Sequence, residues 1–174
     1  LSKIIEHKDG PLSVPNEVAI HTLSKELKNN ISVVLSGEGA DELFGGYGRI
    51  FRSAYDFSRV NKYGFNNLNQ EFKKNILDKY KIEDFTSEVD FFINQYSYIN
   101  KNTKDHIFTK DYTSSNKLDI LSKRFFEKEW IYLKDLEIHD KFIYIFQKIH
   151  LQGLLARLDS STMSSSVEGR VPFT

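Results

Sequence analysis

The stretch "VVLSGEGADELFGGYGR", residues 33–49, decides how this sequence is interpreted. An apolar, β-branched run leads into a segment with five glycines and three acidic residues (Glu38, Asp41 and Glu42) but no lysine. Glycine-rich turns that follow strands commonly bind phosphate and usually bring a cation with them. The spacing fits neither the Walker A loop nor the dinucleotide-binding fingerprint, so the acidic residues need another explanation.

The residues before this stretch indicate a helix followed by a strand. Asn16 is a suitable N-cap for a helix over about residues 17–28. The apolar stripe of that helix consists of Ile20, Leu23 and Leu27. Residues 31–35 are then expected to form a short, buried parallel strand, because a helix precedes them and a glycine turn follows. This order of elements is typical of a doubly wound α/β sheet.

The later part of the chain reads as helical. Residues 50–150 contain many Phe and Tyr residues and no proline, and we interpret the aromatic residues as core. The clearest helical spacing is Phe142, Ile145, Phe146 and Ile149, continued by Leu151, Leu154, Leu155 and Leu158. We therefore expect one partial domain over residues 1–174, with an α/β part in residues 1–49 and a helical part in residues 50–174.

Composition excludes several classes of function. The 174 residues include 24 basic and 24 acidic ones, so net charge gives no reason to expect a nucleic-acid or membrane partner. Cysteine is absent, which excludes disulfides and a thiol nucleophile. Without an apolar span or a signal-peptide pattern, we expect a cytoplasmic protein. The first residue is Leu1 and the only methionine is Met163, so we expect a piece of a longer protein.

The acidic glycine loop can be explained by a metal ion. It lies where ligands bind in open α/β sheets, after the carboxyl end of a strand, and its amides near Ala40 would offer an anion site. Carboxylates repel phosphate unless a cation lies between them, and Mg²⁺ commonly bridges the two. Asp41 could therefore hold a magnesium ion that neutralises departing pyrophosphate. The alternative is that Ser36 and Asp41 only cap a helix.

A second informative stretch is "LLARLDSSTMSSSVEGRVPF", residues 154–173. Arg157 leads a polar stripe with Ser161 and Ser164, which could bind a phosphate. The alternative is an ordinary salt bridge of Arg157 to the neighbourhood of Asp159 or to a crossing helix. Glu168 and Arg170 could pair with each other. The histidines, His139 and His150 among them, lie outside both stretches without metal-binding spacing, and we interpret them as ordinary residues.

Both stretches resemble the synthetase domain of glutamine-dependent asparagine synthetases. Residues 36–47, "SGEGADELFGGY", are similar to that family's S-G-E-G-[AS]-D-E-x-F-G-G-Y motif at every position. Residues 157–173 are similar to its second pattern, R-x-D-x-x-x-M-x-x-S-x-E-x-R-V-P-F, and the two motifs occur in the family's order. Residues 9–29 are similar to the family's helix before the strand, whereas residues 50–150 match only in being helical.

This resemblance implies a helix-rich α/β fold, part of an adenine-nucleotide α-hydrolase-like (ATP pyrophosphatase) domain. One or two parallel strands and a mainly helical C-terminal part are expected. The implied enzyme is a carbon–nitrogen ligase of asparagine biosynthesis. In that enzyme the side-chain carboxylate of the substrate aspartate attacks the α-phosphate of ATP, which gives β-aspartyl-AMP and pyrophosphate. Ammonia from glutamine then displaces AMP. A homodimer of the full-length enzyme is left open.

The resemblance also implies roles for individual residues. The catalytic residues would be Glu38, Asp41 and Arg157, with Asp41 binding Mg²⁺ and pyrophosphate and Glu38 close to the attacking ammonia. The nucleotide and aspartate pocket would be lined by Ser36, Gly37, Glu38, Gly39 and Arg157. Related enzymes that close β-lactam rings have tyrosine in place of Glu38, so Glu38 favours formation of an amide with a separate amine.

Three family features are missing from the sequence. They are the pyrophosphate loop S-G-G-x-D-S, the glutaminase domain with its N-terminal cysteine, and a lysine beyond "RVPF". We therefore expect the chain by itself to be inactive. Two other hypotheses stay open at this point: a related ATP-dependent amidotransferase acting on another carboxylate, such as a sugar acid or peptide, and a non-catalytic helical interaction module with a vestigial nucleotide loop.

Overall fold

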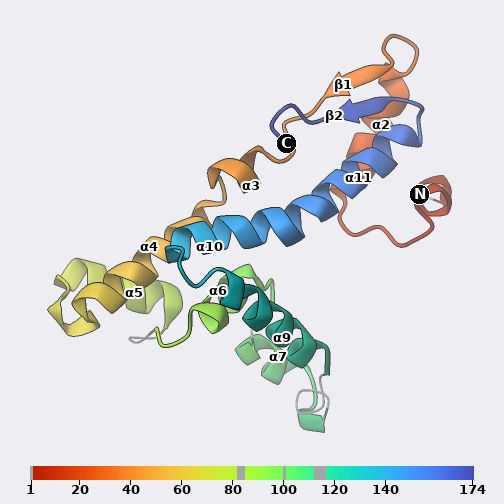
Figure 1. Ribbon diagram of the computed structural model, residues 1–174. Coiled ribbons are helices and arrows are strands. Elements are labelled where there is room, and N and C mark those ends of the chain that lie inside the picture. Colours follow the sequence, from red (N-terminus) through yellow and green to blue (C-terminus); the bar gives the residue numbers. More distant parts are fainter. Residues whose placement is uncertain (1, 82–84, 100, 112–116) are drawn as a thin grey trace. The chain divides into compact units, whose positions relative to one another are not determined.

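The computed structural model describes residues 2–81, 85–99, 101–111 and 117–174 (Figure 1). Its contacts divide the chain into two compact units, residues 1–46 with 145–174, and residues 47–144. The first unit contains α1 (Ser2–Lys8), α2 (Asn16–Leu27), β1 (Val33–Leu35), α3 (Ala40–Phe44), η2 (Phe146–Leu151), α11 (Gln152–Met163) and β2 (Glu168–Arg170). The second contains α4 (Gly48–Tyr63), η1 (Phe65–Asn67), α5 (Gln70–Tyr80), α6 (Glu88–Tyr96), α7 (Lys101–Ile107), α9 (Lys117–Tyr132) and most of α10 (Ile138–Ile145).

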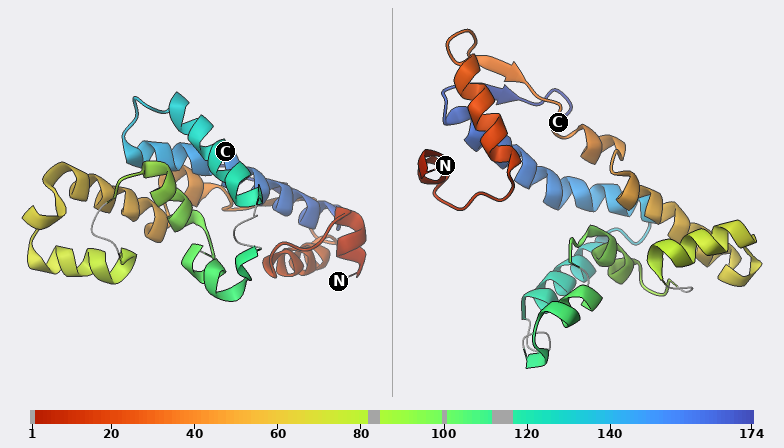
Figure 2. Two further views of the ribbon diagram at one scale, coloured as in Figure 1. Left: turned by 90° about the horizontal axis from the view of Figure 1, so that it is seen from below. Right: turned by 180° about the vertical axis from the view of Figure 1, so that it is seen from behind.

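In the first unit, β1 and β2 form a parallel pair in which Val34 lies opposite Gly169. The ladder continues beyond β1, because the Ser36 amide donates to the carbonyl oxygen of Arg170 over 2.8 Å. Helix α11 packs against both α2 and β2, and Figure 2 shows α2 beside the two strands. Gly169 permits this packing, since a Cβ atom there would lie 3.1 Å from the Thr162 hydroxyl oxygen of α11. The expected helix-rich α/β fold with a parallel pair of strands is confirmed.

The expectation that residues 31–35 form a buried strand is wrong in one respect. The strand is parallel, but the side chains of Val33 and Leu35 are 38% and 69% exposed. In the part of the chain that the structure describes, β1 has β2 as its only neighbouring strand, so one edge lacks a partner. Parallel strands are normally covered on both faces, which is what their apolar sequence reflects.

The predicted start and apolar face of α2 also need correction. The helix begins at Asn16 itself, and Pro15 precedes it without any side-chain cap. Proline suits this position because its fixed φ is already close to helical. Leu23 of the predicted stripe is 60% exposed, whereas Glu17 and Ser24 are buried. The helix therefore turns a partly polar face to α11.

The second unit has an aromatic core, as the sequence predicted. Its buried rings are Phe51, Phe57, Phe85, Phe91, Phe92, Phe126, Trp130 and Phe142. Phe92 and Phe142 meet edge-to-face with ring centroids 4.8 Å apart, a favourable arrangement for aromatic pairs. Glu88 at the start of α6 accepts hydrogen bonds of 2.7 Å from Trp130 and from Lys141, so three helices are tied together at one carboxylate.

The helical pattern predicted from Phe142 onward is confirmed, with a local change of geometry. Helix α10 is followed directly by six residues of π-helix, η2, and then by α11. The predicted apolar residues Phe142, Ile145, Phe146, Leu154 and Leu158 are all buried. A π-helical turn holds more residues than an α-helical turn, so it shifts the face that the following residues present, and such turns are frequent at functional sites.

No helix in the described ranges combines the length and the hydrophobicity needed to cross a bilayer. A single partial domain over residues 1–174 and a cytoplasmic location stay predictions.

Candidate functional site

The two sequence motifs meet at the carboxyl ends of β1 and β2, in the first unit. Because the strands are parallel, the loop after Leu35 and the segment after Arg170 leave the sheet at the same edge. Phe44 of α3 and Phe173 are in edge-to-face contact, with ring centroids 5.9 Å apart.

Gly39 precedes α3 with φ of 93°, and a Cβ atom there would lie 2.6 Å from the Thr174 side chain. Glycine is therefore needed at this position for both its conformation and its small size.

Glu38 and Arg157 form an ion pair at this edge. The Arg157 Nη2 donates to Glu38 Oε1 over 2.7 Å, and the two side chains are only 14% and 20% exposed. Arg157 thus forms a salt bridge, but with Glu38 of the loop after β1 and not with Asp159 or a crossing helix. A phosphate-binding role of Arg157 stays a prediction. The Arg157 Nε is buried and has no acceptor among the described residues. Buried donors are nearly always satisfied, so this unsatisfied N–H is a candidate partner for an oxygen atom of a ligand.

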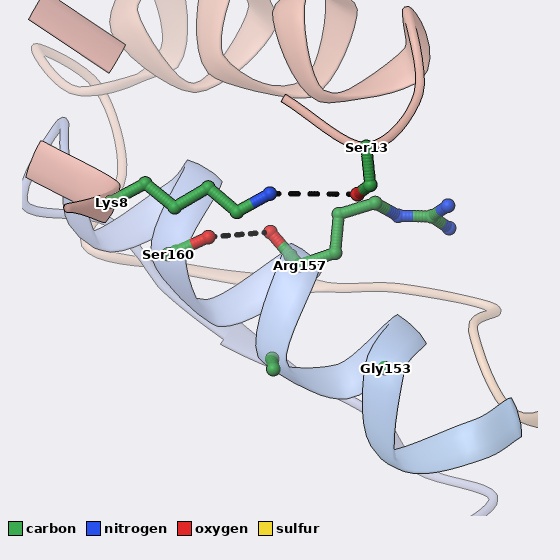
Figure 3. A pocket seen from close by; sticks show the side chains of 6 residues that line it. Lys8, Ser13, Gly153, Arg157 and Ser160 are labelled. Carbon is green, nitrogen blue, oxygen red and sulfur yellow. Dashed lines mark hydrogen bonds between the residues drawn. The ribbon is translucent and has the colours of Figure 1, made fainter. Parts of the chain in front are cut away.

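A cavity of about 290 Å³ lies beside Arg157 (Figure 3). It is lined by Lys8, Ser13, Gly153, Ala156, Arg157 and Ser160. Its two basic side chains, Lys8 and Arg157, are of the kind that binds carboxylate or phosphate oxygens. The Ser160 hydroxyl donates to the Arg157 carbonyl oxygen over 3.2 Å, and the Ser13 hydroxyl donates to Glu17. Nothing in the two motifs points to Lys8 or Ser13, because both residues lie outside them.

Glu17 holds this wall of the cavity in place. The carboxylate of this fully buried residue pairs with Lys8 over 2.7 Å and accepts from the Ser13 hydroxyl and from the backbone amides of Ser13 and Val14. Burial alone would raise the pKa of Glu17, but these hydrogen bonds outweigh it and lower the pKa to about 2. Glu17 therefore stays ionised and positions Lys8 and Ser13 at the cavity.

Asp41 and Glu42 lie next to each other in α3 but in different surroundings. Asp41 is exposed, whereas Glu42 is 1% exposed and lies 3.9 Å from the Nε2 of His150. The alternative in which Ser36 and Asp41 cap a helix is wrong, since no side chain caps α3. The Ser36 hydroxyl instead accepts a hydrogen bond of 3.3 Å from the Glu38 amide within the loop.

The fit of these residues to Mg²⁺ follows from their donors. The described residues contain no cluster of three or more side chains able to hold a metal ion. Magnesium is usually held by one or two carboxylates together with substrate phosphates and water, not by a cage of protein ligands. A lone exposed carboxylate such as Asp41 fits that shared mode of binding and does not fit a dedicated structural metal site.

His150 is a neighbour of the site that the sequence interpretation missed. It lies in η2 and is half-buried, and burial lowers its pKa below the usual value. Arg157 lowers the pKa further, while Glu42 and Glu38 act in the opposite direction. Its spacing of seven residues before Arg157 on a helical run was the one sequence signal that could have identified it.

The serines that follow Arg157 lie in different surroundings. Ser160, and not Ser161 or Ser164, lines the cavity. The Ser161 hydroxyl is buried without a hydrogen-bond partner in the described structure, and the Ser164 hydroxyl oxygen lies 2.6 Å from the Nδ1 of His21 on α2. Glu168 and Arg170 pair as predicted, over 2.8 Å, on the exposed side of β2.

Comparison with known proteins agrees with these motifs. The family model described as asparagine synthase matches residues 1–174. The chain is similar to asparagine synthetase (glutamine-hydrolyzing) 1 of Bacillus subtilis, with 31% identity over 99% of the chain and 28% of that relative. A Mycobacterium tuberculosis protein named "putative asparagine synthetase (glutamine-hydrolyzing)" is 47% identical over 47 residues, 27% of this chain and 7% of the relative.

The chain thus spans little more than a quarter of the length of the Bacillus relative. No solved structure is significantly similar to it. The match over the whole chain and the two motifs at one sheet edge lead to the same conclusion. This chain belongs to the asparagine synthase family.

Proposed function

We propose that the chain is part of a longer, ATP-dependent asparagine synthetase and supplies one side of its synthetase site. The observation that carries this proposal is the Glu38–Arg157 ion pair, which joins the two family motifs, with Arg157 also lining a cavity that contains a second basic side chain. The remaining family features, the pyrophosphate loop and the glutaminase domain, would come from the rest of that polypeptide. The isolated chain is therefore expected not to make asparagine.

The proposed reaction has two steps. An oxygen of the aspartate side-chain carboxylate attacks the α-phosphorus of ATP, the bond to the β-phosphate oxygen breaks, and pyrophosphate leaves. Ammonia derived from glutamine then attacks the acyl carbon of β-aspartyl-AMP, and AMP leaves with the bonding electrons. The nitrogen loses a proton during this second step, so a nearby base is required.

Each residue at the sheet edge has a role in this proposal. The Glu38 carboxylate takes the proton from the attacking nitrogen, because it is an acceptor held in place by Arg157. Arg157 binds a phosphate oxygen, for which its Nε–H is available. Backbone atoms of Ser36, Gly37 and Gly39 line the nucleotide and aspartate pocket, where residues without bulky side chains allow close approach.

Asp41 is the proposed ligand of Mg²⁺ at the pyrophosphate. The metal would neutralise charge on the leaving group when bound. Asp41 contributes a single exposed carboxylate at the start of α3, next to the loop that would approach the nucleotide. An ion shared with phosphate oxygens needs no further protein carboxylate from this chain.

A direct test is to assay the longer polypeptide with ATP, ammonia and a panel of carboxylates. Aspartate-dependent release of pyrophosphate, with asparagine as product, is the expected result. Pyrophosphate release with a sugar acid or a peptide carboxylate, but not with aspartate, would replace the proposal by the related amidotransferase. Pyrophosphate release that is unaffected by Asp41→Ala would instead favour a helical module with a vestigial site.

A further inference from the structure

The side chain of Asp41 lies against the backbone of Gly46. A Cβ atom added to Gly46 would lie 1.9 Å from Asp41 Oδ1 and 2.6 Å from its Cγ. Both distances are far below any van der Waals contact, so the carboxylate occupies the space that a side chain at position 46 would take. The backbone also closes here, because the Gly46 amide donates to the Asp41 carbonyl oxygen over 2.9 Å.

Backbone conformation does not explain glycine at position 46. Gly39, Gly45 and Gly64 have positive φ values, and Gly46 is not among the glycines with that conformation. Alanine at position 46 would therefore not be forced into the left-handed region. The obstacle to a side chain at this position is the carboxylate of Asp41 itself, with the Asp41 Cα as a further contact at 3.1 Å.

Protein groups do not otherwise restrain the Asp41 carboxylate. Its oxygens take part in no hydrogen bond or ion pair within the described residues, in contrast to Glu38, which is paired with Arg157. An unpaired, exposed carboxylate would ordinarily sample several rotamers. The open space over Gly46 makes the observed rotamer accessible, and a methyl group at this position would exclude it.

We infer that Gly46 is a positioning residue for Asp41, since its lack of a side chain lets the carboxylate lie where it can meet the metal and the pyrophosphate. This inference rests on the proposed role of Asp41. It assigns to the second glycine of "FGG" a function distinct from that of Gly45, whose φ of 72° ends α3 as a left-handed C-cap.

Gly46→Ala in the longer synthetase polypeptide tests the inference, with Gly48→Ala as the matched control. Gly48 is close in sequence, and a Cβ atom there would meet nothing within 4 Å. Crystal structures of both variants are compared for the Asp41 side-chain rotamer. Gly46→Ala is expected to move the carboxylate away from residue 46, and Gly48→Ala is expected to leave it in place. An unchanged Asp41 rotamer in Gly46→Ala would overturn the inference.

Activity provides a second measurement. Displacing a group at a reacting centre by about 1 Å can cost about a hundredfold in rate, so Gly46→Ala is expected to slow pyrophosphate release by about tenfold to a hundredfold. The Mg²⁺ concentration needed for half-maximal rate should rise as well. In an Asp41→Asn background, Gly46→Ala should have no further effect, because the displaced ligand is already lost.

The outcomes separate the inference from the proposed function. If Asp41→Asn slows pyrophosphate release but Gly46→Ala does not, the positioning role is wrong while the role of Asp41 holds. If Asp41→Asn has no effect, the proposed role of Asp41 fails and the inference fails with it. Should Gly46→Ala not fold, recovery of folding by Asp41→Ala/Gly46→Ala would support the contact, and continued misfolding would overturn it.

Discussion

Arg157 donates to Glu38 over 2.7 Å, although the two residues are 119 positions apart in the chain. The contact joins the loop after β1 to helix α11 and brings the two motifs of the asparagine synthase family to one sheet edge. It also leaves the Arg157 Nε–H without an acceptor in the described structure. The pair therefore combines an anchored carboxylate with an unsatisfied donor. The proposed roles need both, since Glu38 takes a proton from the attacking ammonia and Arg157 binds a phosphate oxygen.

Glu38→Gln in the longer polypeptide should separate the two steps of the reaction. The amide keeps the size of the side chain but removes the base, so asparagine formation is expected to fall by about 10²- to 10⁴-fold. Single-turnover release of pyrophosphate should fall much less, because the first step does not use this base. Glu26→Gln, at an exposed position of α2, is the charge-matched control. Equal loss in both steps would contradict the assigned role.

Arg157→Lys should weaken binding of ATP. Lysine keeps the positive charge but lacks the Nε–H and the planar fork that can bond Glu38 and a phosphate oxygen together. We expect the KM for ATP to rise by about tenfold, the equivalent of about 1.4 kcal/mol, with a smaller change in the KM for ammonia. Steady-state kinetics at varied ATP check this. A KM for ATP equal to that of the parent enzyme would show that Arg157 does not contact the nucleotide.

Glu17 should contribute stability that is lost in acid. Its pKa is about 2 in the folded protein against an ordinary value of 4.5, so the unfolded state binds the proton more readily. The contribution is complete above pH 4.5 and declines as the pH falls towards 2. The shift corresponds to about 3 kcal/mol in the free energy of unfolding.

Urea unfolding of the chain and of Glu17→Gln between pH 7 and pH 3 measures this contribution. The difference in unfolding free energy between the two proteins is expected to shrink as the pH falls below 4.5. A difference that stays constant over this range would mean that Glu17 does not titrate as described. Glu26→Gln again serves as the control, because Glu26 is exposed on the same helix.

His150 should be neutral at pH 7. Burial lowers its pKa below the usual 6.5, so the unfolded state takes up a proton more readily than the folded one. The contribution of His150 to the free energy of unfolding is therefore present above pH 6.5, and it is lost as the pH falls through the pKa of His150 in the folded protein. An NMR titration of the imidazole protons, with His150→Gln to assign the signal, should give a midpoint below 6.5. A midpoint above 6.5 would show that Glu42 outweighs burial.

The sequence identified the parts of the site that depend on local motifs. The glycine loop, the short helix near Ala40 and the helix carrying Arg157 were all predicted at about their observed positions. Glycine spacing and apolar periodicity report backbone conformation and burial, which are local or nearly local properties. The pairing of Glu168 with Arg170 could be predicted for the same reason. Alternate residues of a strand point to the same face, so both side chains lie on one face of β2.

The sequence did not identify contacts that depend on how distant segments pack. Lys8 and Ser13 reach the cavity only because the buried Glu17 holds them there. His150 approaches Glu42 from the π-helical turn η2, which apolar periodicity does not distinguish from an α-helix. The apolar pattern of α2 predicted that Leu23 is buried and did not identify the buried Glu17. Hydrophobicity alone cannot predict the burial of a carboxylate whose hydrogen bonds are all made within the protein.

In the proposed reaction, the Asp41 carboxylate binds the magnesium ion that neutralises the departing pyrophosphate. The most direct measurement is pyrophosphate release by the longer synthetase polypeptide, with ATP and aspartate, as a function of Mg²⁺ concentration in parent, Asp41→Asn and Glu26→Gln proteins. We predict that Asp41→Asn lowers the maximal rate by at least about a hundredfold and raises the Mg²⁺ requirement, while Glu26→Gln changes neither. Parent-like rates and an unchanged Mg²⁺ requirement in Asp41→Asn would contradict the claim.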